Sequence, residues 1–138
     1  MTDGDDSLFS FSCRFLRGQR MEGVVIGGNI RCFLKLAGTE YWPDMKGKLL
    51  LLEASGGQAP QMACYLAQLQ QLGVFEKING ILLGTFLQME EQETGPGIGE
   101  LVLEYTKNTC PVAQTSQIGH RSDSHAAIIG KPLFLVSE

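Results

Sequence analysis

The chain has 138 residues, of which 43% are hydrophobic and 19% are charged, and its formal net charge at pH 7 is −4. This length and apolar content support one domain with a packed core and argue against intrinsic disorder. Because acidic residues outnumber basic ones by 15 to 11, we expect no electrostatic binding to nucleic acid or to an anionic membrane. No apolar run reaches the ~18–20 residues that span a bilayer, and residues 1–6 are acidic where a secretory signal is basic. We therefore expect a cytoplasmic protein.

The four cysteines indicate free thiols rather than disulfides or a metal site. Cys13, Cys32, Cys64 and Cys110 are widely separated, and no Cys-x-x-Cys pair occurs among them. The spacing that a zinc knuckle or a dithiol redox site needs is therefore missing. Scattered cysteines in a domain of this size are typical of a reducing compartment.

The first third of the chain predicts two strands followed by a helix. Residues 9–15 alternate between apolar and polar side chains, which is typical of a half-buried strand. Residues 23–26 predict a short buried strand that ends at the glycine pair 27–28. Asn29 is a favourable N-cap residue, so we expect a helix over residues 30–36.

The middle of the chain predicts two buried strands that flank a helix. Residues 49–52 are four consecutive leucines, as in a strand covered on both faces, and Glu53 follows them directly. Pro60 opens a helix whose apolar residues recur at helical spacing and which ends at Gly73. Residues 80–84 predict the next buried strand.

The last third predicts a short helix and three strands. After an acidic, glycine-rich loop over residues 90–99, a helix is expected over 100–105 and a strand over 111–115. Residues 126–130 and 132–136 predict an antiparallel pair joined at Gly130. Strands that alternate with helices in the middle, with β structure at both ends, indicate one α/β domain with a mixed parallel and antiparallel sheet.

Glu53 is the first candidate functional residue. A carboxylate at the carboxyl end of a buried strand lies where α/β proteins place functional groups. The alternative is that the strand reaches the surface at this point and Glu53 is simply solvated.

The polar loop over residues 117–125 is the second candidate, because it contains both histidines of the chain. A metal site in this loop would use His120, Asp123 and His125. Their spacing matches no helical histidine pair, which argues against that interpretation.

A nucleophile is harder to identify. Ser122 or Ser124 could form a triad with His120 and Asp123, but neighbours in one loop cannot easily align a nucleophile, a base and an orienting group. Cys110 with His120 is a further alternative, although nothing in the sequence marks Cys110 as reactive. The residues alone therefore indicate a Glu–His pair without its hydroxyl.

Gly27, Gly28 and Asn29 form the third candidate, between a predicted strand and a predicted helix. Such a junction can bind an anion. The dinucleotide fingerprint and the P-loop Lys-Ser/Thr pair are both missing, so a tight turn and close packing are the simpler interpretation.

Several sequence blocks, in one order, resemble the C-terminal domain of the serine LD-carboxypeptidases, the family of the muramoyl-tetrapeptide carboxypeptidases and the microcin-immunity peptidases. The resemblance extends over residues 13–138. The blocks are residues 22–30, 36–44, 46–53, 65–69, 72–75, 78–84 and the pair Gly119-His120.

The resemblance implies a Ser-Glu-His triad. In that family the serine lies in a separate N-terminal domain, and the glutamate and histidine positions fall here on Glu53 and His120. It further implies a swivelling β/β/α domain, no metal or organic cofactor, and a homodimer for the full-length enzyme. We expect residues 1–18 to be a leader, an inter-domain linker and the start of the first strand, residues 19–138 to be the C-terminal domain, and the N-terminal nucleophile domain to be absent.

The substrate that the resemblance implies is a murein tetrapeptide, which is cut at the bond to its terminal D-amino acid. The enzyme would then act in the recycling of cell-wall peptidoglycan. Family members often carry an acidic residue after the glutamate, and an acidic residue and an arginine before residue 65. Ala54, Ala63 and Cys64 occupy these positions, which leaves the substrate open. The alternatives are a microcin-type amide hydrolase domain and a non-catalytic swivelling or interaction module of the same fold.

Overall fold

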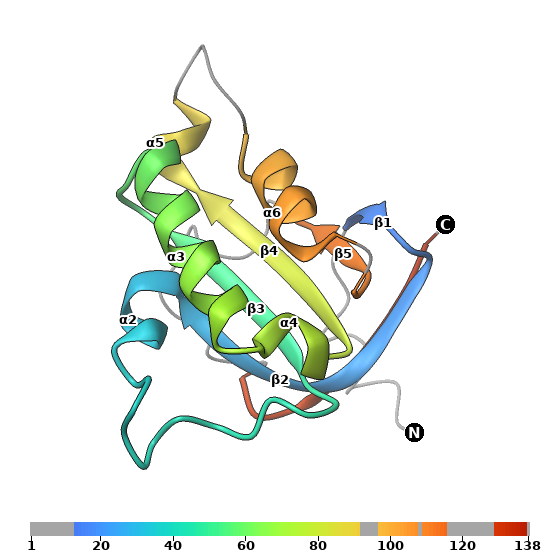
Figure 1. The fold of residues 1–138 in the computed structure, drawn as a ribbon. Coiled ribbons are helices and arrows are strands. Elements are labelled where there is room, and N and C mark those ends of the chain that lie inside the picture. The colour runs from blue at the N-terminus through green and yellow to red at the C-terminus, as the bar shows by residue number, and fades with distance from the viewer. Residues whose placement is uncertain (1–12, 92–96, 108, 116–128, 138) are drawn as a thin grey trace.

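Six strands of the described residues form one sheet in the computed structural model, in the order β1-β5-β4-β3-β2-β6 (Figure 1). The structure describes residues 13–91, 97–107, 109–115 and 129–137. The central strands β5, β4, β3 and β2 run parallel, and the edge strands β1 and β6 are antiparallel to their neighbours. The predicted α/β class with a mixed sheet is therefore confirmed. The strands are β1 (Arg14–Arg17), β2 (Arg20–Asn29), β3 (Leu49–Ala54), β4 (Gly80–Phe86), β5 (Val112–Gln114) and β6 (Pro132–Val136).

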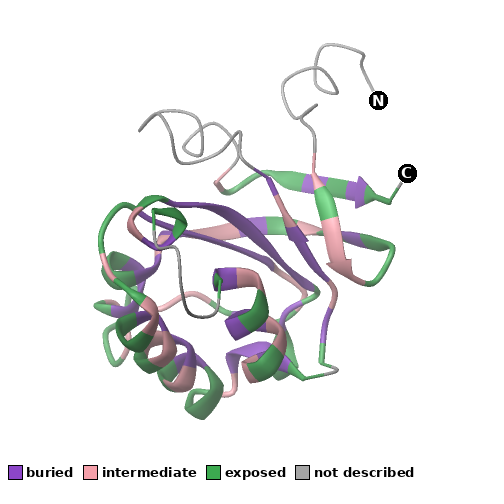
Figure 2. Cartoon of the chain, turned by 90° about the horizontal axis from the view of Figure 1, so that it is seen from above, coloured by how far each residue is buried: buried purple, intermediate pink, exposed green. Residues whose placement is uncertain are grey.

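Helices connect these strands and cover one face of the sheet. Figure 2 shows buried residues along the central strands and exposed residues along the outer side of the helices. The two longest described helices, α3 and α6, both contribute to the larger core cluster. None of the helices in the described part of the chain is long and apolar enough to cross a membrane. The helices are α2 (Ile30–Leu34), α3 (Ala59–Gln71), α4 (Val74–Lys77), α5 (Leu87–Glu90) and α6 (Ile98–Thr106).

The leucine run of β3 lies between two cores. Leu50 and Leu52 belong to the cluster on the helix-covered face, whereas Leu49 and Leu51 belong to a second cluster that β6 helps to build. This division follows from the strand geometry, because successive side chains point to opposite faces. All four leucines are fully buried, as the continuous apolar run predicts.

Local sequence signals explain where the helices begin. The Asn29 Oδ1 accepts the backbone N–H of Cys32 at 3.1 Å, which caps α2 as predicted. Pro60 lies in the first turn of α3, where its missing N–H has no helical partner to lose. The short helices α4 and α5 were not predicted, because a single turn carries no periodic pattern.

The predicted end of the second strand at the glycine pair is wrong. β2 continues through both glycines and ends at Asn29, with Gly27 paired to Leu51 and Gly28 paired to Leu52 of β3. Gly27 has φ +109°, and a Cβ atom there would collide with the Leu51 carbonyl oxygen. Gly27 thus serves the close approach of two strands, and neither glycine forms a turn.

The predicted pairing of residues 126–130 with 132–136 is also wrong for the described part of the tail. β6 pairs antiparallel with β2, and its alternate residues Leu133 and Leu135 enter the second core cluster. Ile129 forms an isolated parallel bridge with Val25. β6 pairs with the backbone groups along one edge of β2, and its apolar residues pack with those of β2 in the second core cluster. Residues 126–128, the start of the first predicted strand (9–12) and the loop over 117–125 lie outside the described residues.

Candidate functional site

Polar residues stand at or next to the carboxyl ends of all four parallel strands. They are Asn29 in β2, Glu53 in β3, Thr85 in β4 and Thr115 directly after β5. Thr115 continues the sheet, since its N–H donates to the Leu83 carbonyl at 2.9 Å. Parallel strands bring these ends to one edge, and that edge is where open α/β sheets bind ligands. This edge is therefore the candidate active site.

Glu53 is buried at this edge, with an exposed fraction of only 8%. It pairs in register with Asn29, and strand alternation places it on the same face as Leu49 and Leu51. The interpretation of Glu53 as a solvated residue at the end of its strand is therefore wrong. A buried carboxylate is stable only with a hydrogen-bonding or charged partner, and Glu53 does take part in such an interaction. Its burial therefore shows that it is held in place at this edge.

A β-bulge lies opposite Glu53. Leu52 pairs with Leu83 and Ala54 pairs with Phe86, so the two residues Gly84 and Thr85 of β4 face the single residue Glu53 of β3. Bulges of this kind redirect side chains and are over-represented beside active sites. The Thr85 hydroxyl is buried and makes no hydrogen bond with the described residues.

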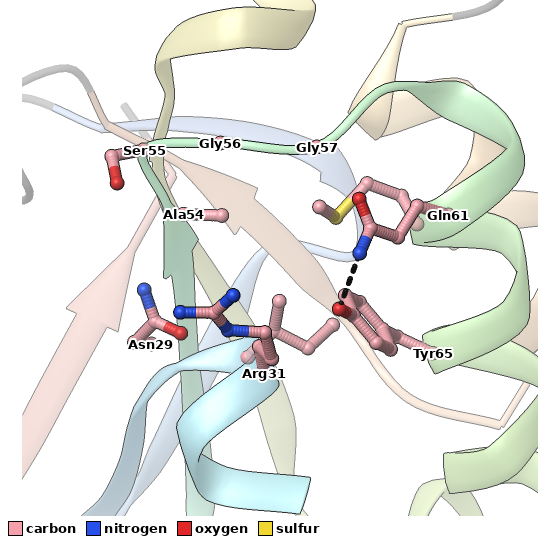
Figure 3. A pocket seen from close by; sticks show the side chains of 10 residues that line it. Asn29, Arg31, Ala54, Ser55, Gly56, Gly57, Gln61 and Tyr65 are labelled. Atoms are coloured by element: carbon pink, nitrogen blue, oxygen red, sulfur yellow. Dashed lines mark hydrogen bonds between the residues drawn. The ribbon is translucent and has the colours of Figure 1, made fainter.

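A cavity of about 180 Å³ opens beside this edge (Figure 3). It lies next to Glu53 along the chain, because Ala54 and Ser55 follow that residue and Asn29 is its strand partner. Arg31 is the charged residue of the lining, and every other lining residue of the described chain is neutral. The cavity is lined by Asn29, Ile30, Arg31, Ala54, Ser55, Gly56, Gly57, Gln61, Met62 and Tyr65.

Hydrogen bonds hold the walls of the cavity. Gln61 donates through Nε2 to the Tyr65 hydroxyl at 2.8 Å, along one turn of α3. The Gly57 N–H donates to the Gln88 side-chain oxygen at 2.6 Å, which ties the loop after β3 to α5. Gly57 has φ +104°, and a Cβ atom there would lie 2.5 Å from the Met62 side chain. The loop is therefore shaped for close packing against the start of α3.

The predicted site residues have different outcomes. Glu53 lies at the candidate site, whereas His120 and the other loop candidates, Asp123, His125, Ser122 and Ser124, lie outside the described residues. Gly27 and Gly28 lie inside β2, so they do not form the anion-binding turn that was considered. No cluster of potential metal ligands occurs within the described ranges.

The interpretation of Cys110 as a nucleophile is not supported. Cys110 is 6% exposed, and burial raises the pKa of its thiol, more than the Thr109 hydrogen bond and the nearby Arg17 lower it. A raised pKa keeps the thiol protonated and unreactive near neutral pH. None of the four cysteines, all of which the structure describes, is part of a disulfide.

Sequence reasoning missed the cavity residues Arg31, Gln61 and Tyr65. Arg31 lies in the first turn of α2, directly after β2, and Gln61 lies in the first turn of α3, after the loop that follows β3. Both are polar residues that closely follow a parallel strand. A polar residue shortly after a predicted parallel strand was therefore the one signal in the sequence that could have identified Arg31 and Gln61.

The chain is similar to several known proteins. Residues 22–135 match the model of the LD-carboxypeptidase C-terminal domain family. A Vibrio cholerae protein named "Putative carboxypeptidase" is 31% identical over 83 residues, which are 59% of this chain and 25% of that protein. The microcin C7 self-immunity protein MccF of Escherichia coli is 31% identical over 78 residues, 56% of this chain and 23% of that protein.

Solved structures share the fold. The crystal structure of an MccF-like protein from Bacillus anthracis matches with a TM-score of 0.72 and 24% identity, over 91% of this chain and 40% of the other. MccF in its inactive mutant apo state matches with a TM-score of 0.67 and 23% identity, over 93% of this chain and 37% of the other. The chain spans about a quarter of the length of the curated relatives it matches.

Proposed function

Because the chain belongs to the LD-carboxypeptidase C-terminal domain family, we propose that it is the glutamate- and histidine-bearing domain of a serine carboxypeptidase. The reaction is hydrolysis of the bond to the terminal D-amino acid of a murein tetrapeptide, as in peptidoglycan recycling in the cytoplasm. The observation that carries the proposal is the burial of Glu53 at the carboxyl edge of the parallel sheet.

In this proposal His120 is the general base. It takes the proton from the attacking serine and returns it to the leaving amine. Glu53 holds the imidazole in the required tautomer and stabilises the imidazolium that forms. Both roles are expectations from the family, carried over to these two positions.

Chain length is compatible with a Glu53–His120 pair. His120 follows Thr115, which lies at the end of β5, by five positions. Five residues reach at most ~17 Å. β5 is separated from β3 only by β4, a lateral distance of ~10 Å at the usual strand spacing. The base can therefore reach the carboxylate from the end of β5.

The nucleophile comes from a separate N-terminal domain in this proposal. The chain covers only 25% of its Vibrio cholerae relative, and the family resemblance assigns the serine to a separate N-terminal domain. We therefore expect the 138-residue chain by itself to be inactive. A homodimer of the two-domain enzyme is expected from the family resemblance alone. The proposed mechanism uses no metal or organic cofactor.

A second candidate function is hydrolysis of an amide in a peptidyl or aminoacyl nucleotide. The observation that favours it is the shared fold with MccF in complex with aspartyl sulfamoyl adenosine and with an MccF-like protein from Streptococcus pneumoniae in complex with AMP. The same Glu53 and His120 would serve either substrate, since both reactions transfer an acyl group to a serine hydroxyl.

The decisive measurement of the function is D-alanine release from a murein tetrapeptide by a two-domain protein that carries this domain. We expect Glu53→Gln to lower kcat by a factor of about 10⁴ and His120→Ala to lower it by about 10⁶, as the loss of the acidic member and of the histidine of a triad does. Glu104→Gln, at an exposed carboxylate of α6, is the matched control and should retain full activity. Retention of activity in Glu53→Gln would favour the non-catalytic module.

The same pair can be tested in the 138-residue chain alone. In proton NMR spectra, Glu53→Gln should shift the ring signals of His120 and leave those of His125 in place. D-alanine release by this chain, abolished by Glu53→Ala or His120→Ala, would instead reveal a nucleophile within it and contradict the proposed two-domain arrangement.

A further inference from the structure

The cavity at this edge of the sheet has one charged residue, Arg31, in its lining, which does not include Glu53. Arg31 lines it and is exposed, and its guanidinium makes no hydrogen bond or ion pair with the described residues. No aspartate or glutamate contributes to the lining that the structure describes. The charge of the cavity lining is therefore positive, whereas the net charge of the whole chain is −4.

The polar groups around Arg31 are arranged as donors. The Asn29 oxygen is occupied by the N–H of Cys32, which leaves the Asn29 Nδ2 hydrogens available to a ligand. The Tyr65 hydroxyl already accepts from Gln61, so its own hydrogen remains available. Figure 3 shows the guanidinium of Arg31 with Asn29 on one side and the Gln61–Tyr65 pair on the other.

A guanidinium, an amide NH₂ and a phenol hydroxyl that share one cavity match an oxyanion. Arginine binds carboxylates and phosphates through two parallel hydrogen bonds, and charge-assisted bonds are about twice as strong as neutral ones. A neutral ligand can accept these hydrogen bonds but forgoes the charge-assisted contribution, and a cationic ligand would be repelled by the guanidinium.

We propose that Arg31 selects the substrate by binding an anionic oxygen group, with Asn29 and Tyr65 as supporting donors. This inference rests on the proposed function and adds to it the residue that recognises the anionic group of the substrate. The group is either the terminal carboxylate of a peptide or the phosphate of an aminoacyl nucleotide. Arg31 is thus a specificity-determining residue next to the catalytic edge.

Two matched ligand pairs test the inference in NMR titrations of the 138-residue chain. The first pair is N-acetyl-L-lysyl-D-alanine and its C-terminal amide, and the second is AMP and adenosine. We expect the anionic member of one pair to bind about tenfold more tightly than its neutral partner, with shifts at the lining residues. The pair that shows this preference identifies the source of the oxyanion.

Variants assign the preference to Arg31. Arg31→Gln should abolish it and Arg31→Lys should retain part of it, because lysine keeps the charge and loses the paired geometry. Lys35→Gln is the matched control: it removes the same charge from an exposed residue at the C-cap of α2, outside the cavity lining. Both exposed substitutions should leave the unfolding midpoint unchanged.

Either of two results would overturn the inference: no preference for the anion in the wild-type chain, or a preference that persists in Arg31→Gln. Glu53→Gln separates this inference from the catalytic proposal. That variant should keep the anion preference in the titration even though it loses D-alanine release in the two-domain protein. Failure of one test therefore leaves the result of the other interpretable.

Discussion

Asn29 and Glu53 are register partners at the carboxyl ends of the neighbouring parallel strands β2 and β3. Asn29 uses its side-chain oxygen to cap α2 and lines the cavity, while Glu53 is buried beside it. This pair connects the two parts of the site: the buried carboxylate proposed for catalysis and the donor-lined cavity proposed for substrate recognition.

The cap gives a first prediction about stability. Asn29→Ala removes the acceptor for the Cys32 N–H and should lower the free energy of unfolding by about 1 kcal/mol. Asn29→Ser keeps an acceptor at the same position and should recover most of this loss. Urea unfolding of both variants measures the effect. Equal destabilisation by alanine and serine would show that the cap is not the cause.

The strand glycines give a second prediction. Gly27→Ala should destabilise the protein by more than about 2 kcal/mol, because the new methyl group would collide with the backbone of β3 in addition to straining the backbone. Gly38→Ala is the control, since Gly38 also has positive φ, +85°, but a Cβ atom there meets nothing within 4 Å. The thermal unfolding midpoint of Gly27→Ala should lie well below that of Gly38→Ala. The reverse order would argue against a close approach of β2 and β3 at Gly27.

The bulge opposite Glu53 gives a third prediction. Thr85→Val replaces a buried hydroxyl that lacks a hydrogen bond within the described structure, so the variant should be as stable as the wild type or more stable by up to about 1 kcal/mol. Thr106→Val should do the opposite, because its hydroxyl donates to the Val102 carbonyl and accepts from Arg17. Denaturant unfolding compares the two. Marked destabilisation by Thr85→Val would indicate that its hydroxyl has a partner.

The raised pKa of the Cys110 thiol gives a fourth prediction. Exposed Cys32 and Cys64 should react with a maleimide rapidly at pH 8, whereas Cys110 should react only as the protein unfolds. Mass spectrometry of the labelled peptides distinguishes them. Rapid labelling of Cys110 in the folded chain would revive it as a candidate nucleophile.

The same shift predicts how stability depends on pH. In the folded state Cys110 keeps its proton above the usual thiol pKa of 9.0, whereas the unfolded chain releases it. Its contribution to stability is therefore fully present below pH 9.0 and is lost as the pH rises through the folded-state pKa. Cys110→Ala should show a smaller decrease in stability over this range than the wild-type chain.

Local patterns in the sequence were enough to predict most of the central elements. Four consecutive leucines predict a strand that is buried on both faces, Asn29 predicts a helix cap, and Pro60 predicts the start of a helix, and the structure confirms each. Glu53 was also identifiable as a candidate, because a carboxylate directly after such a run is unusual. These signals depend only on neighbours along the chain.

The wrong predictions concern contacts between distant segments. The glycine pair 27–28 ends no strand because β3 lies against it, and β6 pairs with β2 because that strand offers a free edge and an apolar face. Nothing within either segment encodes its partner. Strand pairing depends on which backbone groups remain free once the other strands have assembled.

The sequence by itself determined the class of fold, the strand that ends at Glu53 and the resemblance to one family of carboxypeptidases. Only the tertiary structure decided that Glu53 is buried, that Asn29 is its strand partner and that Arg31 and Tyr65 line one cavity beside them. The physical reason is that burial and convergence depend on the parallel arrangement of β2 and β3. That arrangement brings together residues that are far apart in the chain. It is stabilised by backbone hydrogen bonds between strands and by hydrophobic cores to which many segments contribute.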